Sequence, residues 1–188
     1  TKRISEIISQ RFNNDNKNLS KIKIVRFGNV FGSQGSAVEL FINQLNSNIP
    51  ITITDLNVKR YFMSIKEACT LVIDVTRLSK SGKIYVLEMG KQILMRDIIY
   101  KLGQINKIPK DQIKFKVIGL KKGEKLSEEL SLNKKLQKTK NKEIFIAKEP
   151  EYNRDKIDNH IEFLKKSNFS INEKYLKKFI FKFLSKEH

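Results

Sequence analysis

Cysteine, tryptophan and long hydrophobic runs are scarce or missing in this sequence. Its 188 residues include no tryptophan and one cysteine, Cys69, which excludes a disulfide framework. There is no run of about 18 apolar residues that could span a bilayer, and we expect no signal peptide. The two histidines, His160 and His188, both lie in the tail, and no set of metal ligands is evident. We therefore expect a cytoplasmic chain with neither disulfides nor a metal site.

Glycines are also few, and they are not spaced as a dinucleotide-binding fingerprint or a P-loop. Three of the eight follow a short apolar strand and form one loop: Gly28, Gly32 and Gly35. Ser36 and Glu39 form a capping-box pattern, which predicts a helix from Ala37. A strand, a glycine loop and a capped helix can direct backbone amides toward an anion. The same pattern is typical of an ordinary strand-to-helix turn, so both interpretations stay open.

Positive charge dominates, since 38 Lys and Arg face 20 Asp and Glu, for a net charge of +18. Only seven of the basic residues are arginine, and the lysines are spread over the whole length. Aromatic residues do not alternate with arginine as they do in nucleic-acid stacking platforms. We therefore expect no nucleic-acid partner, although a positive field would attract an anionic small substrate. A basic module that binds RNA or anionic lipid is the alternative of another class.

Helical and strand patterns alternate along the chain, which predicts an α/β fold with a mainly parallel sheet. In the helix predicted at 65–78, Cys69 is expected to be a packed thiol on the inner face, with Ala68, Val72 and Ile73. Further helices are predicted at 1–12, at 37 to about 46 and at 95–103. A short helix is expected to follow a turn at 119–126 and to end at 130, and the tail holds two more. The predicted strands are at 22–27, 51–54, 61–64, 83–89, 113–118 and 144–147.

The predicted helices at both ends of the chain carry basic residues. The first begins with Lys2 and Arg3, cations that oppose the helix dipole, and it lacks a capping residue, so we expect the sequence to be the C-terminal portion of a longer protein. The last helix has lysines opposite its apolar side. A helix packed on the domain with a solvated basic face is favoured, and contact with an anionic membrane is the alternative.

Three segments together resemble one protein family. Residues 25–36, VRFGNVFGSQGS, resemble the strand and loop after the catalytic helix of extended short-chain dehydrogenases/reductases. Residues 58–65, VKRYFMSI, resemble the substrate-side strand of these enzymes. Residues 119–130, GLKKGEKLSEEL, resemble a signature of CapD-type polysaccharide-biosynthesis proteins, which are nucleotide-sugar 4,6-dehydratases, and the strand at 84–90 fits the same subgroup.

The resemblance implies the C-terminal portion of an extended Rossmann-type domain whose N-terminal nucleotide-binding half is absent. Residues 1–132 would belong to the NAD(P)-dependent dehydratase domain and its nucleotide-sugar-binding region, and 133–188 would form a Lys-rich helical C-terminal extension. The implied activity is UDP-N-acetylhexosamine (UDP-GlcNAc) 4,6-dehydration for surface polysaccharide or glycan synthesis. A nucleotide-sugar 4-epimerase or reductase on the same fold is the alternative enzyme.

The resemblance also implies properties of a full-length protein. It would use NAD or NADP, bind a UDP-sugar and form a homo-oligomer. Helices upstream of this chain could anchor it to the cytoplasmic side of the inner membrane. The fragment alone is expected to be inactive.

For the cofactor, the resemblance points to the first helix and the glycine loop. Lys2 matches the catalytic-motif lysine that holds the nicotinamide ribose and lowers a neighbouring pKa, a role that suits an ammonium group. Gly28 and Val30 lie at the matching cofactor-side positions.

For the substrate, the resemblance points to Asn29 and Ser36 on the sugar side, to Arg60 and Lys121 at the diphosphate, and to Glu124 at the uridine ribose. A guanidinium fork suits a diphosphate. The purely structural alternatives are a turn-capping Asn, an Arg in a surface ion pair, and a Glu favoured by a helix dipole. Lys121 and the next lysine replace an Arg-Pro pair of the family, so the charge is kept but the fork is lost.

Overall fold

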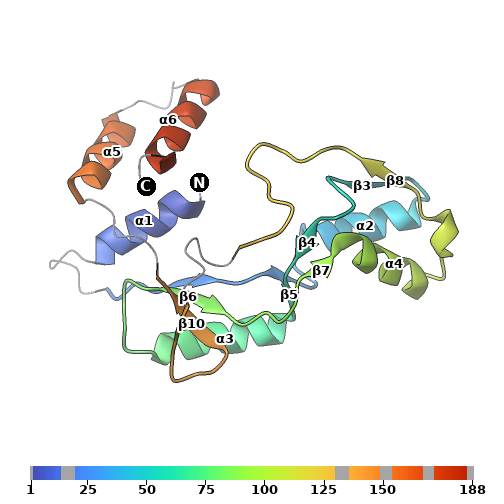
Figure 1. Cartoon of the computed structure of the whole chain (residues 1–188), viewed down its shortest axis with the longest axis horizontal. Coiled ribbons are helices and arrows are strands. Elements are labelled where there is room, and N and C mark those ends of the chain that lie inside the picture. The colour runs from blue at the N-terminus through green and yellow to red at the C-terminus, as the bar shows by residue number, and fades with distance from the viewer. Residues whose placement is uncertain (1, 14–19, 130–135, 149–153, 167–171, 186–188) are drawn as a thin grey trace.

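The computed structural model describes the chain apart from residues 1, 14–19, 130–135, 149–153, 167–171 and 186–188. Figure 1 shows two groups of elements. One group surrounds the main sheet and includes α1, α3, α5 and α6, and the other contains α2 and α4 with short strands. The β4, β5 and β7 strands lie between the two groups.

The main sheet has four strands in the order β1-β6-β10-β9. These strands are β1 (Ile24–Arg26), β6 (Ile84–Leu87), β10 (Ile144–Ala147) and β9 (Leu136–Lys138). β1 and β6 are parallel, whereas β10 is antiparallel to both of its neighbours. The expected α/β fold is confirmed, but this sheet is mixed, because residues 136–147 form an antiparallel hairpin beside β6. That hairpin lies beyond residue 132, so the expected C-terminal extension adds strands as well as helices.

All four residues of β6 are buried, as the continuous apolar run predicts for a strand covered on both faces. Tyr85 and Leu87 pack against the helix α3 (Ile65–Arg77) in one core cluster, whereas Ile84 and Val86 belong to another cluster with β1 and β10. Successive side chains of a strand point to opposite faces, so this division follows directly from the pleat.

The second group is built on the parallel pair of β3 (Ile51–Ile53) and β8 (Phe115–Val117). The helices α2 (Ala37–Asn46) and α4 (Met95–Ile105) pack against this pair, and the short 3-10 helix η1 (Lys110–Gln112) precedes β8. From α2, their shared core includes the side chains of Phe41 and Leu45, with Val38 partly buried. The helices at both ends also form, as α1 (Lys2–Asn13), α5 (Arg154–Lys166) and α6 (Glu173–Ser185).

α6 packs on the domain, in agreement with the favoured prediction for the last helix. Its Phe179 ring stacks on Phe163 of α5 with ring centroids 4.8 Å apart. Its Phe181 ring lies 5.1 Å from the Nζ of Lys122, which comes from the segment at 119–129.

The helix cap predicted at Ser36 forms, but the capping box predicted with it forms only in part. The Ser36 hydroxyl accepts a hydrogen bond from the Glu39 amide, so α2 begins at Ala37 as predicted. The Glu39 carboxylate bonds to the Gly35 amide rather than to that of Ser36, which makes only half of a capping box. A complete capping box, which we did not predict, starts α3 at Ser64.

Two predictions about helices are wrong. The side of α3 that packs on the sheet carries Ala68, Leu71 and Val75, so Cys69 and Ile73 are exposed on the other side. Apolar residues occur on both sides of this helix, and periodicity alone did not identify the side that meets the sheet. The short helix expected after the turn at 119–126 is also absent from the described residues, where a turn is followed by a β-bridge at Ser127. Residues 1 and 130, where predicted helices begin or end, lie outside the described residues.

Two short strand pairs join the groups. β2 (Asn29–Val30) runs parallel to β5 (Phe62–Met63), and β4 (Lys59–Arg60) runs antiparallel to β7 (Ile93–Leu94). The segments that carry the family resemblance, at 25–36 and 58–65, therefore meet at this junction. The junction positions the site described below.

Gly28 is required by the close approach of β2 to the segment before β5. A Cβ added there would lie 2.6 Å from both the Tyr61 Cβ and the Tyr61 carbonyl oxygen, and 2.8 Å from the Met89 Sδ. Because two of these atoms are fixed by the backbone position, we expect Gly28→Ala to destabilise the fold by about 1–3 kcal/mol, the range for overpacking. Urea unfolding followed by circular dichroism measures the effect.

Gly103→Ala is the matched control for this prediction. A Cβ at Gly103 would meet the flexible Cδ1 end of Ile113, which can move, and alanine is about 1 kcal/mol more favourable than glycine inside a helix. The loss should therefore be smaller than at Gly28. If the two variants lost the same free energy of unfolding, the close contact with Tyr61 would not be the reason that residue 28 is glycine.

Candidate functional site

Arg60, at the end of β4, is the centre of an ion-pair cluster. Its Nη2 lies 3.3 Å from the Glu124 carboxylate, and its Nε lies 3.4 Å from the Glu128 carboxylate. Its Nη1 donates to the carbonyl oxygens of Lys59 at 2.8 Å and Leu126 at 3.3 Å. The guanidinium side chain is only 13% exposed. It holds residues 119–129, which we call the strap, against the junction.

Glu124 lies between Arg60 and two further donors. One carboxylate oxygen also accepts a hydrogen bond from the Thr54 hydroxyl at 2.9 Å, and the other accepts from the Lys121 amide at 3.2 Å. Three of the residues predicted for the substrate site, Arg60, Lys121 and Glu124, are therefore brought together. A carboxylate held by several donors is fixed in position by this arrangement.

The strap has a second attachment that sequence reasoning missed. Gln92 donates to the Glu128 carbonyl oxygen at 2.7 Å and accepts from the Ser127 hydroxyl at 2.5 Å. The Lys59 amide also donates to the Leu126 carbonyl oxygen at 2.9 Å. Nothing in the local pattern around Gln92 indicates this role, because its partners are 35 and 36 residues away in the sequence.

The glycine loop lies beside the same junction. The Asn29 amide donates to the Tyr61 carbonyl oxygen at 2.8 Å, so Gly28, Asn29 and Val30 run alongside the residues that follow Arg60. No hydrogen bond is found between the side-chain amide of Asn29 and any other residue that the structure describes. It therefore remains available to a ligand. Ser36, further along the loop, is engaged as the cap of α2.

Lys2 is not part of the cluster around Arg60. It lies exposed in the first turn of α1, and none of the contacts found in the described part of the chain links it to the strap. The structure thus groups Arg60, Lys121 and Glu124 and leaves the predicted catalytic lysine on a separate helix.

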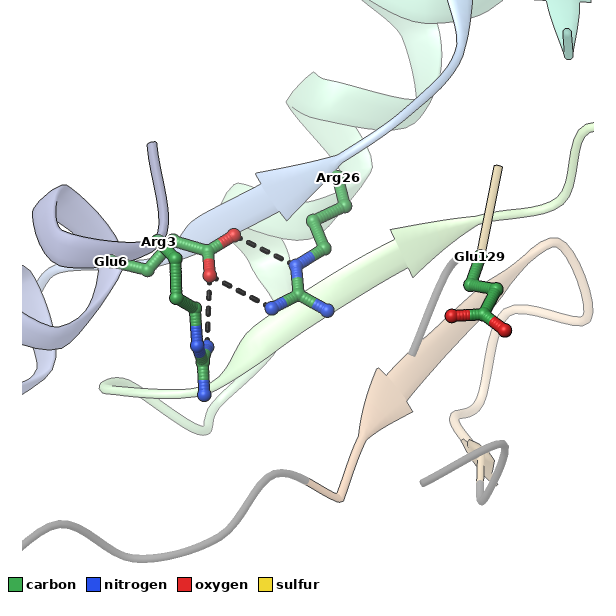
Figure 2. A pocket seen from close by; sticks show the side chains of 4 residues that line it. All are labelled: Arg3, Glu6, Arg26 and Glu129. Carbon is green, nitrogen blue, oxygen red and sulfur yellow. Dashed lines mark hydrogen bonds and ion pairs between the residues drawn. The ribbon is translucent and has the colours of Figure 1, made fainter. Parts of the chain in front are cut away.

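A second charged cluster lines a pocket of about 240 Å³ next to α1 (Figure 2). Arg3, Glu6, Arg26 and Glu129 line it. The Glu6 carboxylate is held by Arg26 through Nε at 2.7 Å and Nη2 at 2.8 Å, and by Arg3 through Nη1 at 2.8 Å. Figure 2 shows the two guanidinium groups converging on the single carboxylate, whereas Glu129 stands apart from it. This cluster ties α1 to β1.

The electrostatics of Glu6 reflect two opposing effects. Burial raises the pKa of its carboxyl, but the hydrogen bonds and charges of Arg26 and Arg3 outweigh burial and hold the pKa below its ordinary value of 4.5. The fork of Arg26 on Glu6 is the strongest geometry for such a pair. The one signal in the sequence was a charged residue, Arg26, inside the apolar stretch that forms β1.

Among the residues that the structure describes, no group of three or more His, Cys, Asp or Glu side chains could hold a metal ion. None of the helices in that part of the chain is long and apolar enough to cross a membrane.

Comparison with known proteins identifies the family. Residues 1–166 match the family described as "Polysaccharide biosynthesis protein". The chain belongs to this family. The resemblance to CapD-type proteins is confirmed by 43% identity to the capsular polysaccharide biosynthesis protein CapD of Staphylococcus aureus, over 71% of this chain and 22% of that protein. The chain thus spans about a fifth of the length of this relative.

Solved structures place this member of the polysaccharide biosynthesis family in the short-chain dehydrogenase/reductase fold. The structure of Pen from Bacillus thuringiensis matches 85% of the chain and 54% of its own length, with a TM-score of 0.63 and 30% identity. DesIV, a dTDP-glucose 4,6-dehydratase from Streptomyces venezuelae with NAD and DAU bound, matches 67% of the chain and 39% of its own length, with a TM-score of 0.56 and 18% identity. At that identity the second match shows the fold alone.

Proposed function

We propose that this chain is the C-terminal part of a UDP-N-acetylhexosamine 4,6-dehydratase, acting on UDP-GlcNAc in surface polysaccharide or glycan synthesis. The observation that carries the proposal is the meeting of Arg60, Lys121 and Glu124 beside the glycine loop. These residues come from two distant segments, at 58–65 and 119–130, and the resemblance assigns all of them to one ligand. The family membership supports the same reading.

The cluster has the chemistry that a nucleotide sugar needs. The Arg60 guanidinium and the Lys121 side chain would hold the diphosphate, since both groups are cationic donors. The fixed Glu124 carboxylate would accept from the uridine ribose. Asn29 would bond to the sugar through its free amide, and Ser36 would stand at the end of the same loop.

The residues present fit one end of a dinucleotide cofactor. Lys2 is exposed, and no hydrogen bond or ion pair of its side chain to another described residue is found, so its ammonium is open to the nicotinamide ribose. Gly28 and Val30 would take the cofactor-side positions that the resemblance gives them. This sequence contains no glycine fingerprint for the cofactor's pyrophosphate. NAD or NADP supplies the hydride acceptor and donor of a redox-neutral dehydration, in which the sugar loses its C5 proton and its C6 hydroxyl.

The product distinguishes this reaction from its nearest alternative. We expect a complete enzyme that contains this chain to convert UDP-GlcNAc into a 4-keto-6-deoxy sugar nucleotide, lighter by one water, as mass spectrometry and NMR would show. A C4 epimer of unchanged mass would contradict the dehydratase and favour a 4-epimerase. That alternative has its own support, because a UDP-glucose 4-epimerase of Rickettsia bellii is 32% identical over 61% of the chain.

The 188-residue chain alone is the control for that assay. It should give neither product, because it supplies only the nicotinamide end of the cofactor site. Turnover by the chain alone would show that Lys2 and the cofactor are misplaced. Homo-oligomer formation, a cytoplasmic location and membrane anchoring by helices of the complete protein remain predictions.

A further inference from the structure

The two carboxylates on Arg60 are held very differently. Glu124 is hydrogen-bonded to the guanidinium, braced by Thr54 and the Lys121 amide, and its side chain is 24% exposed. Glu128 is 38% exposed and reaches the Arg60 Nε at 3.4 Å as an ion pair that does not form a hydrogen bond. No other contact of the Glu128 carboxylate is found among the described residues. The Glu124 carboxylate is therefore fixed by several hydrogen bonds, whereas the Glu128 carboxylate is held by one ion pair.

We propose that the Glu128 carboxylate is an internal occupant of the anion subsite on Arg60, which a nucleoside diphosphate must displace. Glu128 is then the residue that sets how tightly the diphosphate is held. This inference depends on the proposed function in one respect, which is that the ligand is a nucleoside diphosphate. It does not depend on which reaction follows.

The donors of the guanidinium support this arrangement. Nη1 is occupied by the carbonyl oxygens of Lys59 and Leu126, which belong to the backbone and cannot leave without moving β4 or the strap. Nη2 carries two N–H groups, and one of them is given to Glu124. When Glu128 leaves, the Nε–H and the remaining Nη2–H are both open. Two neighbouring N–H donors are the geometry in which arginine binds phosphate.

Charge favours the exchange once a diphosphate arrives. The strap carries three exposed lysines, Lys121, Lys122 and Lys125, which balance its three glutamates, and the chain as a whole has a net charge of +18, whose field attracts a polyanion. The Glu128 side of this ion pair is partly exposed, and at 3.4 Å it lacks a hydrogen bond to Arg60, so it contributes little and a ligand with two phosphates can replace it. Glu124 stays in place because its other bonds do not involve Arg60.

A titration of the 188-residue chain with UDP, followed by NMR, tests the proposal. Glu128→Gln should bind UDP about fivefold more tightly than the wild type, the factor that corresponds to the upper end of exposed ion-pair strengths. Uridine, which lacks the phosphates, should bind the two proteins equally. Glu129→Gln is the matched control, because it removes the same charge one residue away while its carboxylate pairs with Lys125 at 2.6 Å.

A double-mutant cycle tests whether Glu128 changes UDP affinity through Arg60. In an Arg60→Gln background, Glu128→Gln should no longer change UDP affinity. Thermal unfolding of each variant shows that the fold is kept. Tighter binding that persists without Arg60 would overturn the proposal, because Glu128 would then act by another route.

Other results would also overturn it. Weaker or unchanged UDP binding by Glu128→Gln would mean that Glu128 braces the strap rather than competing with the ligand. An equal gain in UDP affinity for Glu129→Gln would show that the effect comes from net charge alone. If neither the wild type nor Glu128→Gln bound UDP, there would be no diphosphate subsite on Arg60. Formation of a C4 epimer by the complete enzyme would contradict the dehydratase and leave this inference standing.

Discussion

Replacing Glu6 by glutamine should lower the free energy of unfolding by about 3 kcal/mol at neutral pH, the lower end of the range for breaking a buried ion pair. The Glu6, Arg3 and Arg26 side chains are only 15–20% exposed. Glutamine keeps the size of the side chain, but it leaves two largely buried guanidinium groups without their shared anion. Urea denaturation at pH 7 measures the loss.

The same variant should change how stability depends on pH. Because the folded-state pKa of Glu6 lies below its ordinary value of 4.5, the unfolded chain binds the proton more readily than the folded chain. The contribution of Glu6 is therefore complete above about pH 4.5 and is lost as the pH falls through the lower, folded-state pKa. Stability of the wild type should drop more steeply in this acid window than that of Glu6→Gln.

A surface pair provides the control for both measurements. Glu162 and Lys165, on α5, are 55% and 69% exposed and 3.5 Å apart. Glu162→Gln should therefore change stability by less than about 0.5 kcal/mol, as is usual for exposed helix pairs. Similar losses at Glu6 and Glu162 would show that the cluster beside α1 is not a stabilising ion pair.

Local signals in the sequence predicted the elements whose cause is local. The cap at Ser36 depends on a hydrogen bond from an amide only three residues away in the sequence, and the buried strand β6 depends on its own apolar run. The strand β9 could not be predicted in this way, since its residues Leu136–Lys138 are exposed and become a strand by pairing with β10. The exposure of Cys69 could not be predicted locally either, because the position of the sheet decides which face of α3 is buried.

The candidate site was predictable in its members but not in its contacts. The family resemblance pointed to Arg60 and Glu124 at one ligand, and the fold brings them within 3.3 Å across 64 residues of sequence. It gave no sign of Gln92 or Glu128, whose roles depend on where the strap crosses β4 and β7. Long-range ion pairs of this kind are set by topology, and no spacing rule applies to them.

Arg60→Ala should weaken binding of UDP to the complete enzyme by about 1.5–3 kcal/mol, the range for hydrogen bonds to charged groups. The guanidinium is the proposed grip on the diphosphate, and alanine removes every donor. Binding of NAD should be nearly unchanged, because Lys2 and the glycine loop do not contact Arg60 through any of the described interactions. Isothermal titration with UDP and with NAD measures the two effects separately.

Arg60 also fastens the strap, so the loss of UDP binding has to be separated from the loss of the strap. Gln92→Leu removes the second attachment of the strap, at Ser127 and the Glu128 carbonyl, without changing any charge. If the guanidinium itself holds the diphosphate, Gln92→Leu should reduce UDP affinity far less than Arg60→Ala. Arg60→Lys should lie between them, because it keeps the charge and loses the fork. Equal losses in the alanine and leucine variants would assign the effect to strap position, and an equal loss of NAD binding would indicate a folding defect.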